Sequence, residues 1–248
     1  MTIKVQAVPC RQDNYAWLLV DTDTGTVALC DPGEAAPALA ALQALPEPGR
    51  CDFVLLTHHH ADHVEGVAAV VAATGAKVVG AAADAHRLPP LDHALAPGDG
   101  LALGKARAVV IDTPGHTRGH IAFHVQAPAA EPDALLCGDT LFSLGCGKLL
   151  EGTAEEMFLS LQRLRVLPPD TLVCCGHEYT ESNARFALTV EPDNEALRAR
   201  AAAVRALRAD GKPTVPTTIA EELATNPFLR APDVATLAAR RLAKDSFR

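Results

Sequence analysis

No run of apolar residues in this 248-residue chain approaches the ~18 residues that a membrane span needs. The first residues, MTIKVQAVPC, contain no apolar core of the kind that an export signal requires. Cationic residues are in the minority, with 22 Lys and Arg against 30 Asp and Glu. We therefore expect no membrane partner, no nucleic-acid partner and a cytoplasmic location.

The motifs of several familiar sites are also missing. The seven cysteines form no C-x-x-C pair, so neither a zinc finger nor a thioredoxin-like redox site is indicated. No G-x-S-x-G nucleophile elbow occurs. Residues 145–148, GCGK, lack the flanking residues of a phosphate-binding P-loop. Cys174 and Cys175 lie inside an apolar run, and we expect them to be buried, reduced thiols.

The pattern of apolar residues predicts a mixed fold in two parts, and 48% hydrophobic content is enough for a sizeable core. Short runs bounded by Gly, Pro and Asp predict strands at 3–8, 16–20, 27–30, 53–56, 77–79, 106–111, 121–125, 135–137 and 172–174. Helical spacing predicts helices at 35–45, 64–73, 154–167, 183–190, 195–209, 219–224 and 234–243. We expect strands to stop at Tyr179, so that an α/β domain (1–176) precedes an all-helical unit (177–248).

Residues 57–63, THHHADH, follow a predicted strand and contain four histidines and one aspartate. Alternate residues of an extended chain point the same way, so His58 and His60 share one side and His59 points to the other. Helical spacing begins just after, which places Asp62 and His63 on a first helical turn. These groups are costly to leave unpaired in a pocket, and a divalent metal ion satisfies imidazole and carboxylate together. The sequence therefore predicts a metal site here, with His59 as a non-ligand.

Three further candidate ligands each follow an apolar run and a glycine: His116, Asp139 and His177. Glycine allows unusual backbone angles, so it can aim the next side chain inwards. Polar side chains that follow several strands are expected to gather at one edge of a sheet. The turn Asp31-Pro32-Gly33 also follows a predicted strand, and we expect it near this edge.

Taken together, THHHADH, GHT, GDT and GHEYT resemble the metallo-β-lactamase superfamily, whose signature is T-H-x-H-x-D-H. This resemblance implies an α+β fold, a four-layer αβ/βα sandwich with the metals at one edge. Further motifs resemble the glyoxalase II, or hydroxyacylglutathione hydrolase, family within that superfamily. They extend from residue 12 to residue 248 and read QDNYAW, GDTLF, GCGK, CGHEYT, NPFLR and KDSFR.

The resemblance implies that the chain is a thioester hydrolase. Its substrates would be S-D-lactoylglutathione and other 2-hydroxyacylglutathiones, cleaved to D-lactate (or another 2-hydroxy acid) and glutathione in the second step of methylglyoxal detoxification. A hydroxide bridging two divalent metal ions would attack the thioester; zinc is the first expectation, with iron or manganese as alternatives. One metal would be held by His58, His60 and His116, the second by Asp62, His63 and His177, with Asp139 between them. Asp62 would also act in catalysis by orienting the hydroxide.

The resemblance further implies that glutathione is bound by Lys148, Tyr179, Arg241 and Lys244. Residues 193–248 hold ten Lys and Arg against seven Asp and Glu, which suits the two carboxylates of glutathione. One position departs from the family. Leu150 stands where an aromatic residue is common, so one contact to glutathione is expected to be missing or replaced.

Two other functions compete with this hypothesis. A glutathione-linked persulfide dioxygenase resembles the same superfamily but uses a single iron and lacks the long helical tail. A module that keeps a metal only for structure would have no use for an open two-metal site. We expect a monomer that binds a small-molecule glutathione thioester.

Overall fold

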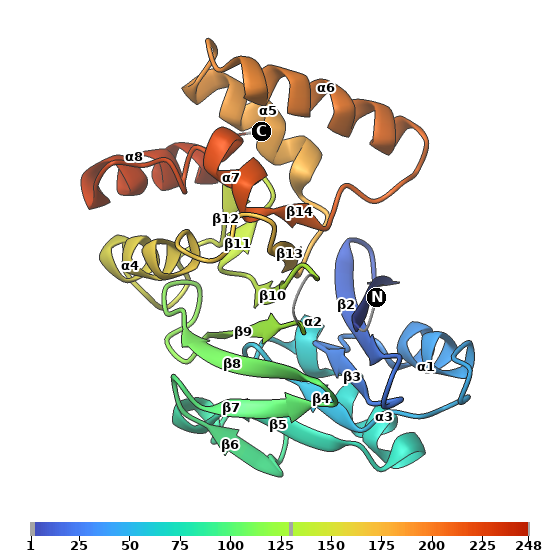
Figure 1. The fold of residues 1–248 in the computed structure, drawn as a ribbon. Coiled ribbons are helices and arrows are strands. Elements are labelled where there is room, and N and C mark those ends of the chain that lie inside the picture. The colour runs from blue at the N-terminus through green and yellow to red at the C-terminus, as the bar shows by residue number, and fades with distance from the viewer. Residues whose placement is uncertain (1–2, 129–130, 248) are drawn as a thin grey trace.

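The computed structural model describes residues 3–128 and 131–247. Two six-stranded sheets face each other, as Figure 1 shows. In order across the first sheet, the strands are β1 (Ile3–Cys10), β2 (Asn14–Asp21), β3 (Val27–Cys30), β4 (Phe53–Leu55), β5 (Lys77–Ala81) and β6 (His93–Leu95). The second sheet contains β14 (Thr217–Thr218), β13 (Leu172–Cys175), β10 (Ala134–Gly138), β9 (Ile121–Gln126), β8 (Ala106–Asp112) and β7 (Gly100–Leu103).

The first sheet is covered on both faces, and β2 shows how its sequence produces this. Tyr15, Trp17 and Leu19 belong to the large core that also contains residues of the second sheet. Ala16 and Leu18 point the opposite way, into a core shared with α1 (Ala35–Gln43) and α3 (Val67–Thr74). Successive residues of a strand face opposite sides, so a strand buried on both faces is apolar throughout.

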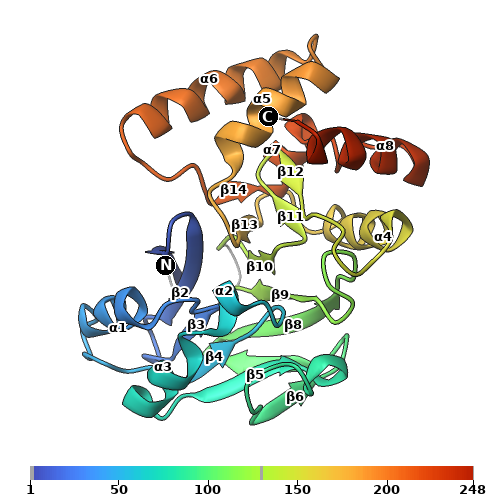
Figure 2. The same cartoon turned by 180° about the vertical axis from the view of Figure 1, so that it is seen from behind.

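The remaining helices are α2 (Ala61–Val64), the 3-10 turn η1 (Ala82–Asp84), α4 (Ala154–Leu164), α5 (Thr180–Val190), α6 (Glu195–Ala209), α7 (Ile219–Thr225) and α8 (Val234–Asp245). Helices α5 to α8 gather at one end of the molecule (Figures 1 and 2). There they lie against a two-stranded hairpin of β11 (Leu141–Phe142) and β12 (Gly145–Cys146). None of the helices in the described part of the chain has the length and apolar character needed to cross a bilayer.

The predicted α+β sandwich is confirmed, with one correction in the C-terminal unit. Thr217 and Thr218 form a short strand that pairs with Val173 and Leu172, so this unit is not entirely helical. The chain returns after α6 to the open edge of β13, whose backbone groups would otherwise lack partners. The strands β6 (His93–Leu95) and β7 (Gly100–Leu103) were not predicted from the sequence.

The helix predicted at 64–73 is instead two helices, α2 and α3, separated at Gly66. The amide of Gly66 donates to the carbonyl of Pro32 over 2.9 Å. A Cβ atom at Gly66 would lie 2.4 Å from the same carbonyl oxygen, so a side chain does not fit. This close approach to the turn after β3 holds α2 beside the sheet edge.

Candidate metal centre and substrate pocket

Four loops at one edge of the two sheets supply the predicted metal ligands. In the first sheet, β4 leads into the 57–63 segment and α2. In the second sheet, β8, β10 and β13 run in the same direction, because β9 is antiparallel to β8 and β10 and β10 is parallel to β13. Their carboxyl ends therefore lie together. The side chains carried by the four loops are His58, His60, Asp62, His63, His116, Asp139 and His177.

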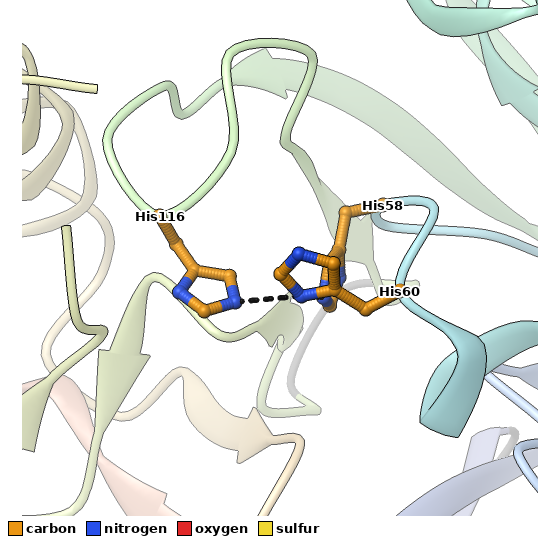
Figure 3. A group of neighbouring side chains, drawn as sticks. All are labelled: His58, His60 and His116. Carbon is orange, nitrogen blue, oxygen red and sulfur yellow. Dashed lines mark hydrogen bonds between the residues drawn. The ribbon is translucent and has the colours of Figure 1, made fainter. Parts of the chain in front are cut away.

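His58, His60 and His116 form the first group (Figure 3). Nδ1 of His60 lies 3.1 Å from Nε2 of His58 and 3.0 Å from Nε2 of His116. His58 is fully buried and His116 nearly so, whereas His60 is partly accessible. Three ring nitrogens converging on one point from two loops is the arrangement expected of a metal-binding trio.

Asp62, His63 and His177 form the second group. Nε2 of His63 lies 3.3 Å from Nε2 of His177, and Oδ2 of Asp62 lies 3.6 and 3.5 Å from these two nitrogens. The two imidazoles are buried and the carboxylate is partly exposed. This group therefore presents two nitrogens and one oxygen to a single point.

Asp139 lies between the two groups. Its Oδ2 is 3.5 Å from Nε2 of His116 in the first group, and 3.3 Å from Nε2 of His177 in the second. Its Oδ1 is 3.4 Å from Nε2 of His63. Burial opposes ionisation of this carboxyl, but the imidazoles of His63, His177 and His116 outweigh it and hold the pKa of Asp139 well below its usual range.

The electrostatics of the cluster fit divalent cations. Oδ1 of Asp139 is buried and has no hydrogen-bond partner, which is costly unless a cation meets it. Burial lowers the pKa of His63, yet the carboxylates of Asp139 and Asp31 raise it to about 9, so the site favours positive charge. Burial and the neighbouring imidazoles lower the pKa of His58 well below its usual value, which keeps it in the neutral form that binds metals.

Hydrogen bonds to the second ring nitrogen aim the histidines at the cluster. Nδ1 of His63 lies 3.1 Å from Oδ2 of Asp31, and Nδ1 of His177 lies 3.0 Å from Oδ1 of Asp13. Nδ1 of His116 donates to the carbonyl of Lys148 over 2.8 Å. In each case Nε2 is left with its lone pair towards the cluster, the usual means by which proteins orient a metal-binding histidine.

A short relay orients His58. The hydroxyl of Thr57 donates to Asp31 over 2.6 Å, so it is free to accept from Nδ1 of His58, which lies 3.0 Å away. Asp62 is oriented as well, because the side-chain nitrogen of Asn14, Nδ2, donates to its Oδ2 over 2.9 Å. The Asp13-Asn14 pair lies in the QDNYAW segment, which the sequence marked as a family motif without indicating these contacts.

His59 points away from the cluster, as its position in the extended segment predicts. Its Nδ1 lies 3.2 Å from the buried carboxylate of Asp84, which also accepts from Arg87. His120, directly before β9, accepts from the backbone amide of Asp139 over 3.1 Å. It therefore supports the central aspartate without pointing at either group.

The four residues predicted to bind glutathione line one pocket of about 200 Å³ beside the second group. Phe142 and Asn183 complete much of its wall. Tyr179 joins the pocket to the cluster, because its ring stacks on that of His177. The predicted residues in the pocket are Lys148, Tyr179, Arg241 and Lys244.

The two cations of α8 differ in their freedom to bind a ligand. Arg241 is buried, and its guanidinium already donates to Asp245 and to the carbonyl of Cys146. Lys244 donates to the backbone and hydroxyl oxygens of Ser182. Burial, with a contribution from Arg241, lowers the pKa of Lys244 to about 8. Lys244 can therefore turn towards an anion at lower cost than Arg241 can.

Leu150 does not line the same pocket as Lys148. It is 55% exposed and faces a second hollow of about 640 Å³, together with Arg87, Arg118 and Glu151. The 148–151 segment thus contributes to both hollows, Lys148 to the first and Leu150 and Glu151 to the second.

Comparison with known proteins covers nearly the whole chain. The sequence profile of the metallo-beta-lactamase superfamily matches residues 11–177, and that of the hydroxyacylglutathione hydrolase C-terminus matches residues 178–247. A hydroxyacylglutathione hydrolase of Jannaschia sp. (strain CCS1) is 58% identical, over 95% of this chain and 90% of the relative. The chain belongs to the hydroxyacylglutathione hydrolase family.

Solved structures agree with this family fold. ETHE1 from Myxococcus xanthus is similar with a TM-score of 0.70 and 25% identity, covering 98% of this chain and 90% of that one. TTHA1623, solved in a di-iron-bound form, is 31% identical with a TM-score of 0.55, covering 66% of this chain and 87% of that one. Family membership and the His/Asp groups together establish a site for divalent metal. The predicted resemblance to glyoxalase II is confirmed.

Proposed function

We propose that this chain hydrolyses S-D-lactoylglutathione, and other 2-hydroxyacylglutathiones, to the 2-hydroxy acid and glutathione, the second step of methylglyoxal detoxification. The observation that carries the proposal is the position of the pocket. A hollow with lysine side chains at its wall opens directly beside a cluster of five histidines and two aspartates. A substrate with an anionic tripeptide and a reactive carbonyl needs both features side by side.

Two divalent metal ions would occupy the cluster, with zinc first and iron or manganese as alternatives. His58, His60 and His116 would hold one ion, Asp62, His63 and His177 the other, and Asp139 would contact both. When bound, such ions supply Lewis acidity, which lowers the pKa of water and polarises a carbonyl. The structure solved for TTHA1623 contains two irons, and this chain resembles it over 66% of its length.

Asp62 is the side chain best placed to orient the attacking water. Burial raises the pKa of its carboxyl, but the bond from Asn14 and the nearby His63 and His177 outweigh this and lower it below its usual value. The carboxylate is thus ionised at neutral pH, partly exposed and fixed by Asn14. It can accept a hydrogen bond from the attacking water and so direct a lone pair of the water oxygen towards the thioester carbonyl.

Glutathione would lie in the pocket with its carboxylates near Lys148 and Lys244, its backbone against Tyr179, and Arg241 in the wall behind. Ionised carboxylates and cations form strong hydrogen bonds in a partly buried site. The departing group is a thiolate whose parent thiol has a pKa of about 8.5, so it leaves without a strong acid. The reaction therefore requires no dedicated acid beside the cluster.

The same proposal covers the organisation and setting of the chain. Residues 1–176 form the catalytic domain and residues 177–248 form the glutathione-binding domain. All seven cysteines are buried and free, which favours a reducing compartment and hence the cytoplasm. A monomer suffices, because every residue assigned here comes from a single chain.

A persulfide dioxygenase with a single iron is the second candidate. Its single iron would be held by two histidines and one aspartate, so it would leave most of the seven clustered side chains without a purpose. The match to the hydroxyacylglutathione hydrolase C-terminus over residues 178–247 favours the hydrolase further.

The experiment that decides between them incubates metal-loaded protein with S-D-lactoylglutathione and records thiol release. A parallel incubation with glutathione persulfide records oxygen uptake. We expect thiol release and no oxygen uptake. Oxygen uptake without thioester cleavage would favour the dioxygenase over the hydrolase. The absence of both signals would refute both functions.

A further inference from the structure

The hairpin β11–β12 lies in the chain between Asp139 and Lys148, that is, between the central aspartate of the cluster and a residue of the substrate pocket. Ser143 and Leu144 form its turn. Leu144 is fully buried and has a φ of 60°, a left-handed conformation that is unfavourable for a residue with a branched side chain. Such a turn persists only where its surroundings hold it.

The helical unit holds this hairpin through its backbone. Glu222 accepts from the amide of Leu144 over 2.8 Å. The side-chain nitrogen of Asn226, Nδ2, donates to the carbonyls of Phe142 and Gly145, over 3.0 and 2.9 Å. Helices α5 and α8 each add one donor. The side chain of Asn183 donates to the carbonyl of Ser143 over 3.0 Å, and that of Arg241 donates to the carbonyl of Cys146 over 2.8 Å. Five backbone groups of the hairpin thus bond to side chains at least 40 residues further along the chain.

Both ends of the hairpin lead to the metal cluster. The amide of Gly147 donates to the carbonyl of Thr140 over 3.1 Å, next to Asp139. A Cβ atom on Gly147 would lie 1.9 Å from the carbonyl oxygen of Asp139, so the two segments pack too closely here for any side chain. One residue later, the carbonyl of Lys148 accepts from Nδ1 of His116. A shift of the hairpin therefore moves Asp139 and rotates His116.

We propose that Glu222, from α7, and Asn226, the residue directly after α7, are positioning residues for the metal cluster and the substrate pocket. They fix the hairpin, which in turn fixes Asp139, His116 and the wall residue Lys148. Both side chains are 0% exposed, so neither can touch a substrate, and their hydrogen bonds go to the hairpin, to each other and to the turn after α7 rather than to the metal cluster. The C-terminal unit thus shapes the metal site as well as the substrate pocket. This inference rests on the metal site of the proposed function.

The two residues also support each other. Oε2 of Glu222 accepts from Asn226 over 2.9 Å as well as from Leu144. Oδ1 of Asn226 accepts from the amides of Phe228 and Leu229, which caps the turn that follows α7. The donor and acceptor ends of Asn226 therefore have separate tasks: the donor end contacts the hairpin, and the acceptor end holds the turn that follows α7.

This separation allows a sharp test with Asn226→Asp. The variant keeps an oxygen for the turn after α7 but loses the donor to Phe142 and Gly145. It also places a second carboxyl beside Glu222, so the double variant Asn226→Asp/Glu222→Gln is made to remove that repulsion. Asn194→Asp is the matched control. Asn194 also donates to a glutamate (Glu191) and a backbone carbonyl (Ala224) and accepts from an amide, but it does not contact the hairpin.

Metal affinity is measured by competition with a chelator, and kcat and KM with S-D-lactoylglutathione, on folded protein well below each melting temperature. We expect both Asn226 variants to bind metal about tenfold or more weakly and to lose kcat, as for groups that orient metal ligands elsewhere. Asn194→Asp should lower the melting temperature while metal affinity stays within about twofold of the wild type.

Wild-type metal affinity in Asn226→Asp would overturn the proposal, as would an equal loss in Asn194→Asp. Recovery of affinity in the double variant would assign the loss to repulsion between buried carboxyls and would also overturn it. The metal measurement does not depend on the substrate. If the wild-type protein failed to cleave the thioester but Asn226→Asp still bound metal weakly, the proposed function would fall and this inference would stand.

Discussion

The ring of Tyr179 stacks on the ring of His177, with centroids 4.5 Å apart and an angle of 4° between the planes. His177 belongs to the metal cluster, and Tyr179 forms part of the pocket wall beside it. Phe142 packs edge-on against both rings. The aromatic contacts therefore connect the place where substrate binds to the place where it reacts.

Two changes at Tyr179 should separate these roles. Tyr179→Phe keeps the stacked ring and removes the hydroxyl, so KM for S-D-lactoylglutathione should rise several-fold while kcat changes little. Tyr179→Ala also frees the ring of His177, and kcat should fall by about tenfold or more because ligand orientation is lost. Steady-state kinetics of both variants provide the measurement. Equal kcat values in the two variants would show that the stacking is not needed.

The hydrogen bond that Nδ1 of His177 donates to Asp13 is the most exposed of the contacts that aim a ligand at the cluster. Asp13→Ala should weaken metal binding by about 10- to 100-fold, since the imidazole loses the group that fixes its orientation. Chelator competition followed by metal analysis measures this. Asp133→Ala, which removes a similar bond to His124 away from the cluster, is the control. If both variants lost metal equally, orientation of His177 could not be the cause.

Substrate binding should depend on pH through Lys244. Burial, and secondarily Arg241, lowers the pKa of Lys244 to about 8, so its charge is lost as pH rises through 8. Carboxylates of glutathione stay ionised over this range. KM should therefore rise between pH 7 and pH 9 in the wild type, whereas Lys244→Arg, which stays protonated, should show a flatter profile. Parallel profiles for the two proteins would exclude Lys244 as an anion-binding group.

Glu222 should make stability depend on pH. Burial raises the pKa of its carboxyl from 4.5 to about 7. The folded state then holds the proton more tightly than the unfolded state, so this stabilisation is complete below pH 4.5 and is lost as pH rises through 7. The loss is on the order of 3 kcal/mol. Glu222→Gln lacks this titration. The free energy of unfolding of the variant, measured in denaturant titrations, should therefore increase relative to that of the wild type as pH rises from 5 to 7.5. A constant difference would mean that Glu222 does not titrate in that range.

The location of the cluster could be predicted because it depends on local pattern. His116, Asp139 and His177 each follow a short apolar strand, and strand pairing alone brings such strand ends to one edge. His58, His60 and His63 lie within one short segment, so their spacing already implied convergence. The resemblance to a family added the assignment of ligands to two groups, and the structure brings those ligands together.

The groups that orient the ligands could not be predicted in the same way. Asp13 and His177 are 164 residues apart, and they meet because the turn after β1 packs against the end of β13. The amide of Tyr15 donates to the carbonyl of Gly176 at the same place. Such contacts depend on how the two sheets are placed, which no local pattern encodes. The role of Glu222 and Asn226 was hidden for the same reason.

Sequence patterns also failed where tertiary contacts decide local structure. The apolar spacing at 64–73 suited one helix, but the approach of Gly66 to Pro32 divides it. Thr217 and Thr218 follow a segment rich in proline, and only the free edge of β13 makes them a strand. Arg241 and Lys244 both line the pocket that the resemblance implied, yet the guanidinium of Arg241 is largely occupied by Asp245 and Cys146.

The central claim is that one cluster holds two metal ions that act together on a glutathione thioester. Its most direct test is a titration of metal-free protein with zinc, in which bound metal and the rate of S-D-lactoylglutathione hydrolysis are measured on the same samples. We predict that the rate rises to its maximum only as occupancy approaches about two ions per chain. A maximum reached with one ion per chain, or no hydrolysis at any occupancy, would contradict the account.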